Sequence, residues 1–317
     1  MRLPRLSKKD DIQPPEKPLN AEEWQEWRTR LKHLTNFETV MLRRMIKENQ
    51  LYPNEAVMQS IKLWFESIPG EKWTGRLTSM ENGWGCPVCN QVLETIELSK
   101  KEYNILKKKI MKNVMQGNDI FKKTTPQELK RFQDFMENRL PYDIVLDGLN
   151  IVRCVSRICG YNVLFDVVSY FAQQNLRLLV LGRKHLNEFQ FWKWNAMTAR
   201  QGKVDFFFTE NISQDDPFLV YATLHSGNNC KFVTRDLLRD HKACLPESIQ
   251  QLFFKWQRGH QLMPFASRTK KIYFAPILSY DTVVQTTGDT WHIPYDDHLV
   301  ERYSYEVPRK WLCLRRK

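Results

Sequence analysis

Two adjacent aspartates stand directly before a proline and an apolar run in the stretch "NISQDDPFLVYATL", residues 211–224. Adjacent like charges repel, and a helix start needs only one capping acid. Asp216 precedes Pro217 and has the position of an N-cap followed by a first-turn proline, so capping alone could explain it. Asp215 has no such explanation. The pair therefore favours a site whose ligand is positively charged.

Two further acids follow short apolar runs: Asp147 ends "YDIVLD" and Asp236 follows "KFVTR". In an open parallel sheet, ligands bind at the carboxyl ends of the strands, so carboxylates from three chain segments would meet at one edge. They would repel unless a cation lies between them. Mg²⁺ (or Mn²⁺) accepts carboxylate and phosphate oxygens and can promote cleavage of a phosphodiester. Simpler explanations are a turn at Asp147-Gly148 and a cap at Asp236.

Basic residues are expected near the same edge. Arg183 and Lys184 follow "LRLLVL", and Arg235 and Arg239 flank Asp236. Cations beside a metal site suit a phosphate backbone, which needs its charge neutralised without base reading. They could equally be ion-pair partners of the acids.

The elements that would position these acids are short apolar runs separated by helical stretches. The runs are "YDIVLDG", "LRLLVLG", "VDFFFTE" and "CKFVTRD", and the helical stretches are at about 163–173, 193–201 and 217–226. Buried strands alternating with helices predict an α/β fold with a mainly parallel sheet.

Composition limits the class of protein. The 317 residues are 42% hydrophobic, enough for two or three units with their own cores. No apolar run approaches the length of a membrane span, and the N-terminus has no apolar signal segment. Seven cysteines in a chain of this length do not indicate a disulfide scaffold. The net charge of +12 favours an anionic polymer such as nucleic acid as partner.

The stretch "CPVC" gives Cys86 and Cys89 the spacing of half a zinc site. Two more ligands are needed. The spacing leaves two pairs open: His241 with Cys244, or His292 with Cys313.

Several long motifs resemble one family. "DIVLDGLN", "LRLLVLGRKH", "DDPFLVYATLHSGNNCKFVTRDLLRDH" and "SYDTVVQTTGDTWHIPY" are similar to the metallonuclease domain of protein-only RNase P, with the animal mitochondrial form the closer likeness. The resemblance spans roughly residues 71–317. It implies a PIN-like (NYN) domain whose metal-binding aspartates fall on Asp147, Asp215, Asp216 and Asp236. It also favours His292 and Cys313 as the other zinc ligands, in a structural site.

The resemblance also implies an arrangement of domains. In the N-terminal part, "IKENQLYPN" is similar to the turn of a pentatricopeptide repeat, and no second copy follows, so the repeat array of the family is expected to be largely missing. The expected parts are a flexible basic tail (1–20), a helical remnant of the array (21–70), a split zinc-binding module with connecting helices (71–140 and 286–317) and the metallonuclease domain (141–285).

The function implied is that of a metal-dependent endoribonuclease that removes 5′ leaders from precursor tRNAs and leaves a 5′-phosphate. By resemblance, the enzyme is mitochondrial and works with a tRNA methyltransferase–dehydrogenase subcomplex. Two alternatives remain at this stage: a nuclease of the same fold acting on other RNA, and a non-catalytic RNA-binding scaffold.

Overall fold

The structure is a computed structural model that describes residues 52–68, 70–80, 85–113, 125–153, 160–184, 203–210, 216–238, 245–266, 272–297 and 307–317. The chain forms two compact units. The first unit comprises Met1–Thr95 with Ser279–Lys317, and the second comprises Ile96–Leu278. Among the described helices, none has the length and apolar character that crossing a membrane requires.

The second unit is built on a five-stranded sheet with the order β4-β3-β2-β5-β6. All its strand pairs are parallel. The strands are β2 (Ile144–Asp147), β3 (Leu178–Arg183), β4 (Val204–Thr209), β5 (Lys231–Val233) and β6 (Gln261–Leu262). The first four correspond to the apolar runs seen in the sequence, which confirms the predicted α/β class with a parallel sheet.

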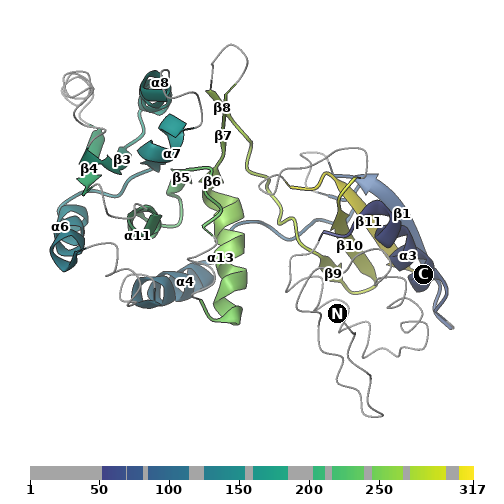
Figure 1. Cartoon of the computed structure of the whole chain (residues 1–317). Helices are drawn as coiled ribbons and strands as arrows, with labels where there is room; N and C mark the ends of the chain where they lie inside the picture. The colour runs from purple at the N-terminus through teal and green to yellow at the C-terminus, as the bar shows by residue number, and fades with distance from the viewer. Residues whose placement is uncertain are drawn as a thin grey trace, which may run out of the picture. The chain divides into compact units, whose positions relative to one another are not determined.

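Helices cover both faces of this sheet (Figure 1). On one face lie α4 (Lys100–Asn113), α6 (Pro126–Glu137), α11 (Asp216–Ser226) and α13 (Glu247–His260). On the other lie α7 (Gly148–Arg153) and α8 (Gly160–Ala172). Successive strand residues alternate between the two cores, because side chains of a strand point to opposite faces. Val145 packs with the first group, whereas Ile144 and Leu146 pack with the second.

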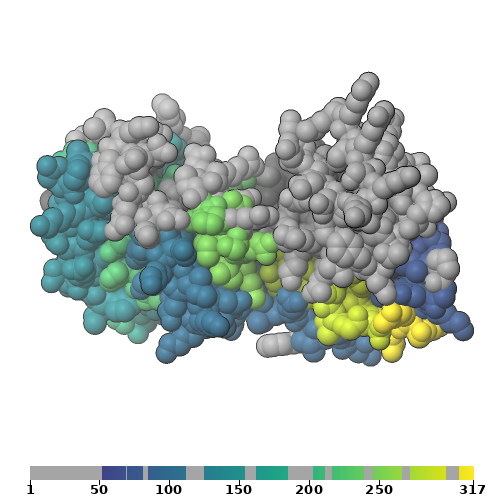
Figure 2. All heavy atoms as spheres, turned by 90° about the horizontal axis from the view of Figure 1, so that it is seen from below, coloured from purple at the N-terminus to yellow at the C-terminus, as the bar shows by residue number. Residues whose placement is uncertain are grey.

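Capping residues in the sequence define where two of these helices begin. Before α4, Ser99 and Glu102 form a capping box: the Ser99 N–H donates to Glu102 Oε2 at 2.8 Å, and the Glu102 N–H donates to Ser99 Oγ at 3.3 Å. Before α6, Thr125 Oγ1 accepts from the Glu128 N–H at 3.2 Å, and Pro126 follows. Atoms of α4 and α13 adjoin on the surface seen in Figure 2, where they are blue and green.

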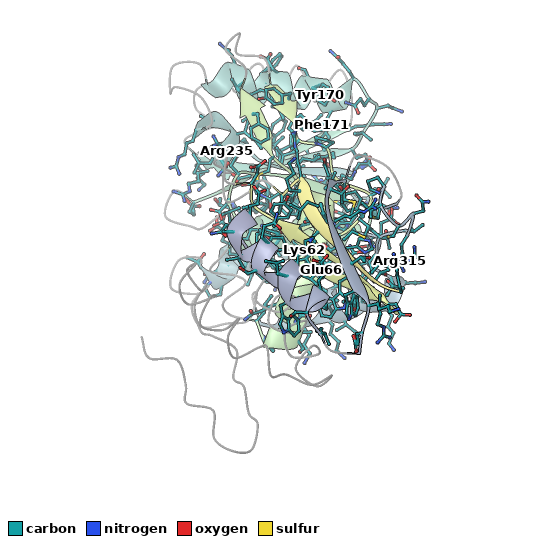
Figure 3. All side chains as sticks on the ribbon, turned by 90° about the vertical axis from the view of Figure 1, so that its right-hand side faces the viewer. Lys62, Glu66, Tyr170, Phe171, Arg235 and Arg315 are labelled. Carbon is teal, nitrogen blue, oxygen red and sulfur yellow. The ribbon has the colours of Figure 1, made fainter. Side chains whose placement is uncertain are left out.

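A short hairpin completes the second unit. Its strands are β7 (Pro264–Ala266) and β8 (Ile272–Phe274), which pair antiparallel. Phe274 lies against α8, with ring centroids 5.0 Å from Phe171 and 5.7 Å from Tyr170. The two α8 residues are labelled in Figure 3. The hairpin is thus held to the helix-covered face by aromatic contacts.

The first unit contains a four-stranded antiparallel sheet in the order β1-β11-β10-β9. The strands are β1 (Trp73–Ser79), β9 (Gln285–Thr287), β10 (Thr290–Tyr295) and β11 (Lys310–Arg316). Gly288, with φ +55°, lies in the turn between β9 and β10. A glycine suits this turn because a side chain would strain the left-handed backbone.

Helix α3 (Glu55–Glu66) packs its apolar side on this sheet. Asn54 caps it by accepting the Val57 N–H at 2.9 Å. Phe65 is fully buried and meets Trp73 and Trp291 edge-on, with centroids 5.0 and 5.3 Å away. On the outer side, Lys62 and Glu66 form a 2.8 Å ion pair one turn apart (Figure 3). The α3 helix falls in the predicted helical segment, whose earlier half lies outside the described residues.

The two units divide the chain at 95/96 and 278/279, whereas the sequence suggested divisions at 140/141 and 285/286. Helices α4 and α6, which the sequence scheme grouped with the split module, pack in the core of the parallel sheet. The reason is their apolar faces: Leu106 and Ile110 of α4 and Phe132 of α6 are fully buried there. The predicted tail (1–20) and the helical stretch at 193–201 lie outside the described residues.

Candidate functional site

Three of the four predicted aspartates belong to the described part of the chain, and all three follow strands of the parallel sheet. Asp147 is the last residue of β2, Asp236 follows β5, and Asp216 is the first residue of α11 after β4. Strands β2 and β5 are direct neighbours. Asp215 lies outside the described residues. The carboxyl edge of the sheet therefore carries acids from separate chain segments, as predicted from the strand ends.

Asp147 is buried, with 5% of its surface exposed, and it ties two strands together. Its Oδ2 accepts the Thr234 hydroxyl at 2.8 Å, and its Oδ1 accepts the Asn150 N–H at 2.9 Å. Thr234 is completely buried. These two bonds fix the Asp147 carboxylate at the end of β2.

Gly148 is required directly after Asp147 by a close approach of two segments. A Cβ on this residue would lie 2.6 Å from the Leu181 carbonyl oxygen of β3, which is closer than side-chain carbons come to other atoms. The glycine is also the first residue of α7. The dipeptide Asp147-Gly148 therefore marks a strand that passes directly into a helix rather than a simple turn.

Asp236 differs from Asp147 in being exposed to solvent. Its N–H donates to Thr234 Oγ1 at 3.1 Å, and its Oδ1 accepts the Leu238 N–H at 2.6 Å. The second bond closes a local turn. One oxygen of Asp236 therefore has a structural task. The suggested helix cap depends on residues 239–244, which lie outside the described residues. The described residues place no donor on Oδ2.

Asp216 lies just inside the helix rather than before it, since α11 begins at this residue and Pro217 is the second. An acid in the first turn is favourable beside the partial positive charge of a helix N-terminus. The structural explanation of Asp216 therefore holds in part. Its neighbour Asp215 stands directly before the helix start, the position of an N-cap, and lies outside the described residues.

The predicted cations have different surroundings. Arg183 ends β3 and is half-buried, whereas Lys184 is exposed and forms an ion pair with Glu210. Arg235 is exposed, is labelled in Figure 3, and donates its backbone N–H to Asn150 Oδ1 at 2.9 Å. Arg239 lies outside the described residues. Exposed ion pairs contribute little stability, so Lys184 can exchange its partner for a phosphate at small cost.

Sequence reasoning missed the neutral residues that hold the acids. Thr234 and Asn150 occur in the quoted motifs "KFVTRD" and "DGLN", but nothing in their type or spacing distinguishes them from ordinary loop residues. They matter because the fold brings their donor atoms within hydrogen-bonding distance of the Asp147 carboxylate.

Carboxylate and hydroxyl oxygens form a donor set that suits Mg²⁺ or Mn²⁺. Mg²⁺ is often held by one or two carboxylates with waters and substrate phosphate, so it needs no closed protein cage. Among the described residues, the aspartates do not form a cluster of metal-ligand atoms like the cysteine–histidine group below. An ion at this edge would share its ligands with water and substrate.

Four predicted zinc ligands come together in the first unit. Ligand atoms of Cys86, Cys89, His292 and Cys313 all lie within 4.8 Å of one another. Cys89 Sγ is 3.2 Å from His292 Nε2, and His292 faces Cys313 across the β10–β11 pair. Three thiols and an imidazole are the donors of a tetrahedral structural zinc site. The other pair that spacing allowed, His241 with Cys244, lies outside the described residues.

The local chain shapes this group. The Cys86 carbonyl accepts the Asn90 N–H at 2.7 Å, and the Cys86 N–H donates to the Gln91 carbonyl at 2.9 Å, which turns the "CPVC" segment back on itself. Asn90 adopts the left-handed conformation, with φ 60°. Cys86, His292 and Cys313 are each 1% exposed. The group is therefore closed to solvent apart from Cys89, which is half-buried.

The thiols influence one another strongly. A hydrogen bond from Cys313 lowers the pKa of Cys86 to about 3, despite opposition from burial. The same contact, together with burial, raises the pKa of Cys313. Burial raises the pKa of Cys89 as well. Without a cation the group therefore favours one thiolate rather than three, which is the electrostatic conflict that a bound divalent ion removes.

The fold and the site together define an α/β protein with acids at the carboxyl edge of a parallel sheet, attached to an antiparallel unit with a cysteine–histidine group. The model of the protein-only RNase P family matches residues 80–313. The chain belongs to that family.

The relatives that this chain matches are named as ribonuclease P proteins. The chain is 56% identical over 275 residues to the mitochondrial ribonuclease P catalytic subunit of Mus musculus, an alignment that covers 86% of this chain and 47% of that protein. It is 25% identical over 256 residues to the chloroplastic/mitochondrial proteinaceous RNase P 1 of Arabidopsis thaliana, covering 77% and 42%. The chain thus spans about half the length of the curated relatives that it matches.

A solved structure has the same fold. The crystal structure of nuclear proteinaceous RNase P 2 from A. thaliana superposes with a TM-score of 0.59 at 18% sequence identity, covering 95% of this chain and 68% of that one. At this identity the likeness concerns the fold alone.

Proposed function

We propose that this chain is a metal-dependent endoribonuclease that removes 5′ leaders from precursor tRNAs in mitochondria. The observation that carries the proposal is the position of Asp147 at the end of β2 and of Asp236 just after the neighbouring strand β5, in a chain of the protein-only RNase P family. The relative from Mus musculus is named as a mitochondrial catalytic subunit of ribonuclease P, which supports both the activity and the location.

In this proposal the second unit is a PIN-like (NYN) nuclease domain, and Asp147, Asp215, Asp216 and Asp236 hold Mg²⁺ or Mn²⁺. When bound, the ion supplies a Lewis acid that activates water and stabilises the leaving oxygen. Thr234 and Asn150 both donate to Asp147 and so fix its carboxylate. Asp236 is exposed to solvent and would be accessible to substrate.

The reaction adds water across one phosphodiester. The bond between phosphorus and the leader's 3′ oxygen breaks, so the leader ends in a 3′-hydroxyl and the tRNA in a 5′-phosphate. Arg183, Lys184, Arg235 and Arg239 are the proposed contacts to the phosphate backbone. Such contacts hold the RNA in place but do not distinguish one sequence from another.

The cysteine–histidine group is proposed to bind Zn²⁺ as a structural ion, with Cys86, Cys89, His292 and Cys313 as ligands. Four protein ligands leave no open position for water or substrate. The ion would join the turn at residues 86–91 to strands β10 and β11. In this assignment zinc stabilises the first unit and takes no part in cleavage.

Partner proteins form a further part of the proposal. The name of the Mus musculus relative describes a subunit, and the family likeness suggests a tRNA methyltransferase–dehydrogenase subcomplex as partner. Backbone contacts alone cannot recognise the folded shape of a tRNA, so we expect such a partner to increase both the rate and the accuracy of cleavage.

The test is single-turnover cleavage of a 5′-labelled precursor tRNA across a magnesium titration, with mapping of the new 5′ end. It is run with and without the subcomplex at near-physiological salt. Magnesium-dependent cleavage at the mature 5′ end, faster with the subcomplex, is expected. Equal cleavage of an unstructured RNA of the same length would instead indicate a nuclease for other RNA. Binding without cleavage under all conditions would indicate a scaffold.

A further inference from the structure

The segment after β5 carries two of the groups at the proposed metal edge. Its described residues are 234–238, with Thr234 first and Asp236 in the middle. Leu238 has a φ of 51°, which is unusual for a residue with a side chain. A loop of this shape keeps its form only when neighbouring groups hold it.

Two buried glutamines of α13 and β6 hold this loop. The Gln261 side-chain Nε2 donates to the Thr234 carbonyl at 2.9 Å and to the Asp236 carbonyl at 2.8 Å. Gln257 Nε2 donates to the Leu237 carbonyl at 3.1 Å and to Gln261 Oε1 at 2.7 Å. Both side chains belong to residues that are 8% exposed. Three carbonyls of the loop are thereby bound by two amides.

Both polar ends of the Gln261 amide have partners. Its Nε2 contacts the two loop carbonyls and, at 3.5 Å, Met263 Sδ, and its oxygen accepts from Gln257. Its backbone lies in β6, which pairs with β5 in the register Phe232↔Gln261. The side chain therefore reaches from the neighbouring strand over the end of β5. Packing alone does not require an amide here, since a methionine would fill a similar volume.

We propose that Gln261, oriented by Gln257, is a positioning residue for the metal-binding aspartates. This inference rests on the proposed function. Gln261 fixes the backbone of Asp236 directly. It also fixes the backbone of Thr234, whose hydroxyl donates to Asp147 Oδ2 at 2.8 Å. One amide thus sets the separation of two carboxylates, one at the end of β2 and one in the segment after β5.

The expected effect follows from the role of groups that orient metal ligands. Loss of such a group commonly costs about 10–100-fold in metal affinity. With methionine at position 261, three polar groups lose their partner and the loop is free to shift away from β6. Metal binding should weaken, while a high metal concentration should restore most of the cleavage rate.

The experiment measures Mn²⁺ binding to the full chain by titration calorimetry, alongside the melting temperature and the magnesium midpoint of single-turnover cleavage. Gln261→Met and Gln257→Met are compared with Gln250→Met. Gln250 is a matched control, since it lies on α13 and also donates its amide to a carbonyl, that of Leu245 at 2.9 Å, but it makes no bond to residues 234–238. Asp147→Asn identifies the part of Mn²⁺ binding that belongs to the proposed edge.

Gln261→Met should raise the Mn²⁺ dissociation constant and the magnesium midpoint about tenfold or more relative to Gln250→Met. Equal affinities in these two variants, with binding lost in Asp147→Asn, would overturn the positioning role and leave the proposed function standing. No Mn²⁺ binding by the wild-type chain would overturn the metal edge itself. If Gln261→Met fails to fold, Gln257→Met decides, because it removes the bond that orients the Gln261 amide and the bond to the Leu237 carbonyl; an affinity equal to that of Gln250→Met would then contradict the proposal.

Discussion

The cysteine–histidine group of the first unit and the aspartates of the second unit differ in ligand type, in burial and in closure. The first group brings four sulfur and nitrogen donors within 4.8 Å of one another, and three of its residues are 1% exposed. The aspartates are oxygen donors of mixed exposure, with Asp147 buried and Asp236 open to solvent. A closed set of soft ligands suits a permanent ion. An open set of hard ligands suits an ion that must also bind water and phosphate.

Within the second unit, acids at the two ends of the parallel sheet differ in their hydrogen-bond and ion-pair partners. At the amino end of β4, Asp205 is paired with Arg139 at 3.2 Å and Arg177 at 3.6 Å, and it accepts the Tyr142 hydroxyl at 2.9 Å. At the carboxyl edge, Asp147 accepts from a hydroxyl and a backbone N–H, and Asp236 accepts from a backbone N–H.

The largest expected effect is on cleavage by Asp147→Asn. Single-turnover cleavage of precursor tRNA should fall about a hundredfold or more, because a buried group that provides charge for the reaction is lost. The melting temperature should stay the same or rise, since the Thr234 hydroxyl can rotate and accept from the new amide. Near wild-type rates in both Asp147→Asn and Asp236→Asn at saturating magnesium would contradict the four-aspartate site.

An intermediate effect is expected for Cys313→Ala, this time on stability. Losing one ligand of a structural ion should release zinc and lower stability by about 2 kcal/mol or more, which corresponds to about 4–8 °C in melting temperature. Cleavage below the new melting temperature should persist. Zinc content is measured by elemental analysis, with His241→Ala expected to retain the metal. Full zinc in Cys313→Ala would exclude this ligand set.

The smallest effect is expected for Asp205→Asn at the amino ends of the strands. Removing a partly exposed acid paired with two arginines should cost about 1 kcal/mol, or about 2–4 °C in melting temperature. The magnesium midpoint of cleavage should not change. A shift in that midpoint comparable to the one in Asp236→Asn would show that the two ends of the sheet do not have separate roles.

Much of the parallel-sheet unit was predictable because its strands are short and nearly continuous in apolar residues. Runs such as "DIVL" and "LLVL" have no other stable placement than a sheet covered on both faces. The acids at their ends followed from the same reasoning. Strand β6, with only Gln261 and Leu262, is too short to show a sequence pattern, so its glutamine was not predicted as a functional residue. Hydrogen bonds between distant side chains have no periodicity that a sequence can display.

The cysteine–histidine group shows a different limit of what the sequence predicts. The pair Cys86 and Cys89 was visible as local spacing, but spacing alone left the second pair open. The structure explains the choice of His292 and Cys313 through the register of β10 against β11, which sets these two residues opposite each other. Strand register depends on the whole antiparallel sheet. A family resemblance could suggest the pair, whereas composition and spacing could not.

The pairing of β1 with β11 has a consequence for synthesis of the chain on the ribosome. Thr74 and Arg315, which are partners in this pair, are 241 residues apart, and the whole parallel-sheet unit lies between them. Strand β11 lies between β1 and β10. Each of these two strands therefore has an unpaired edge until β11 has been synthesised. The second unit can fold first, since domains fold as they are synthesised. Of the four strands, β11 is synthesised last, and it carries Cys313. The sheet and the cysteine–histidine group are therefore completed in one event.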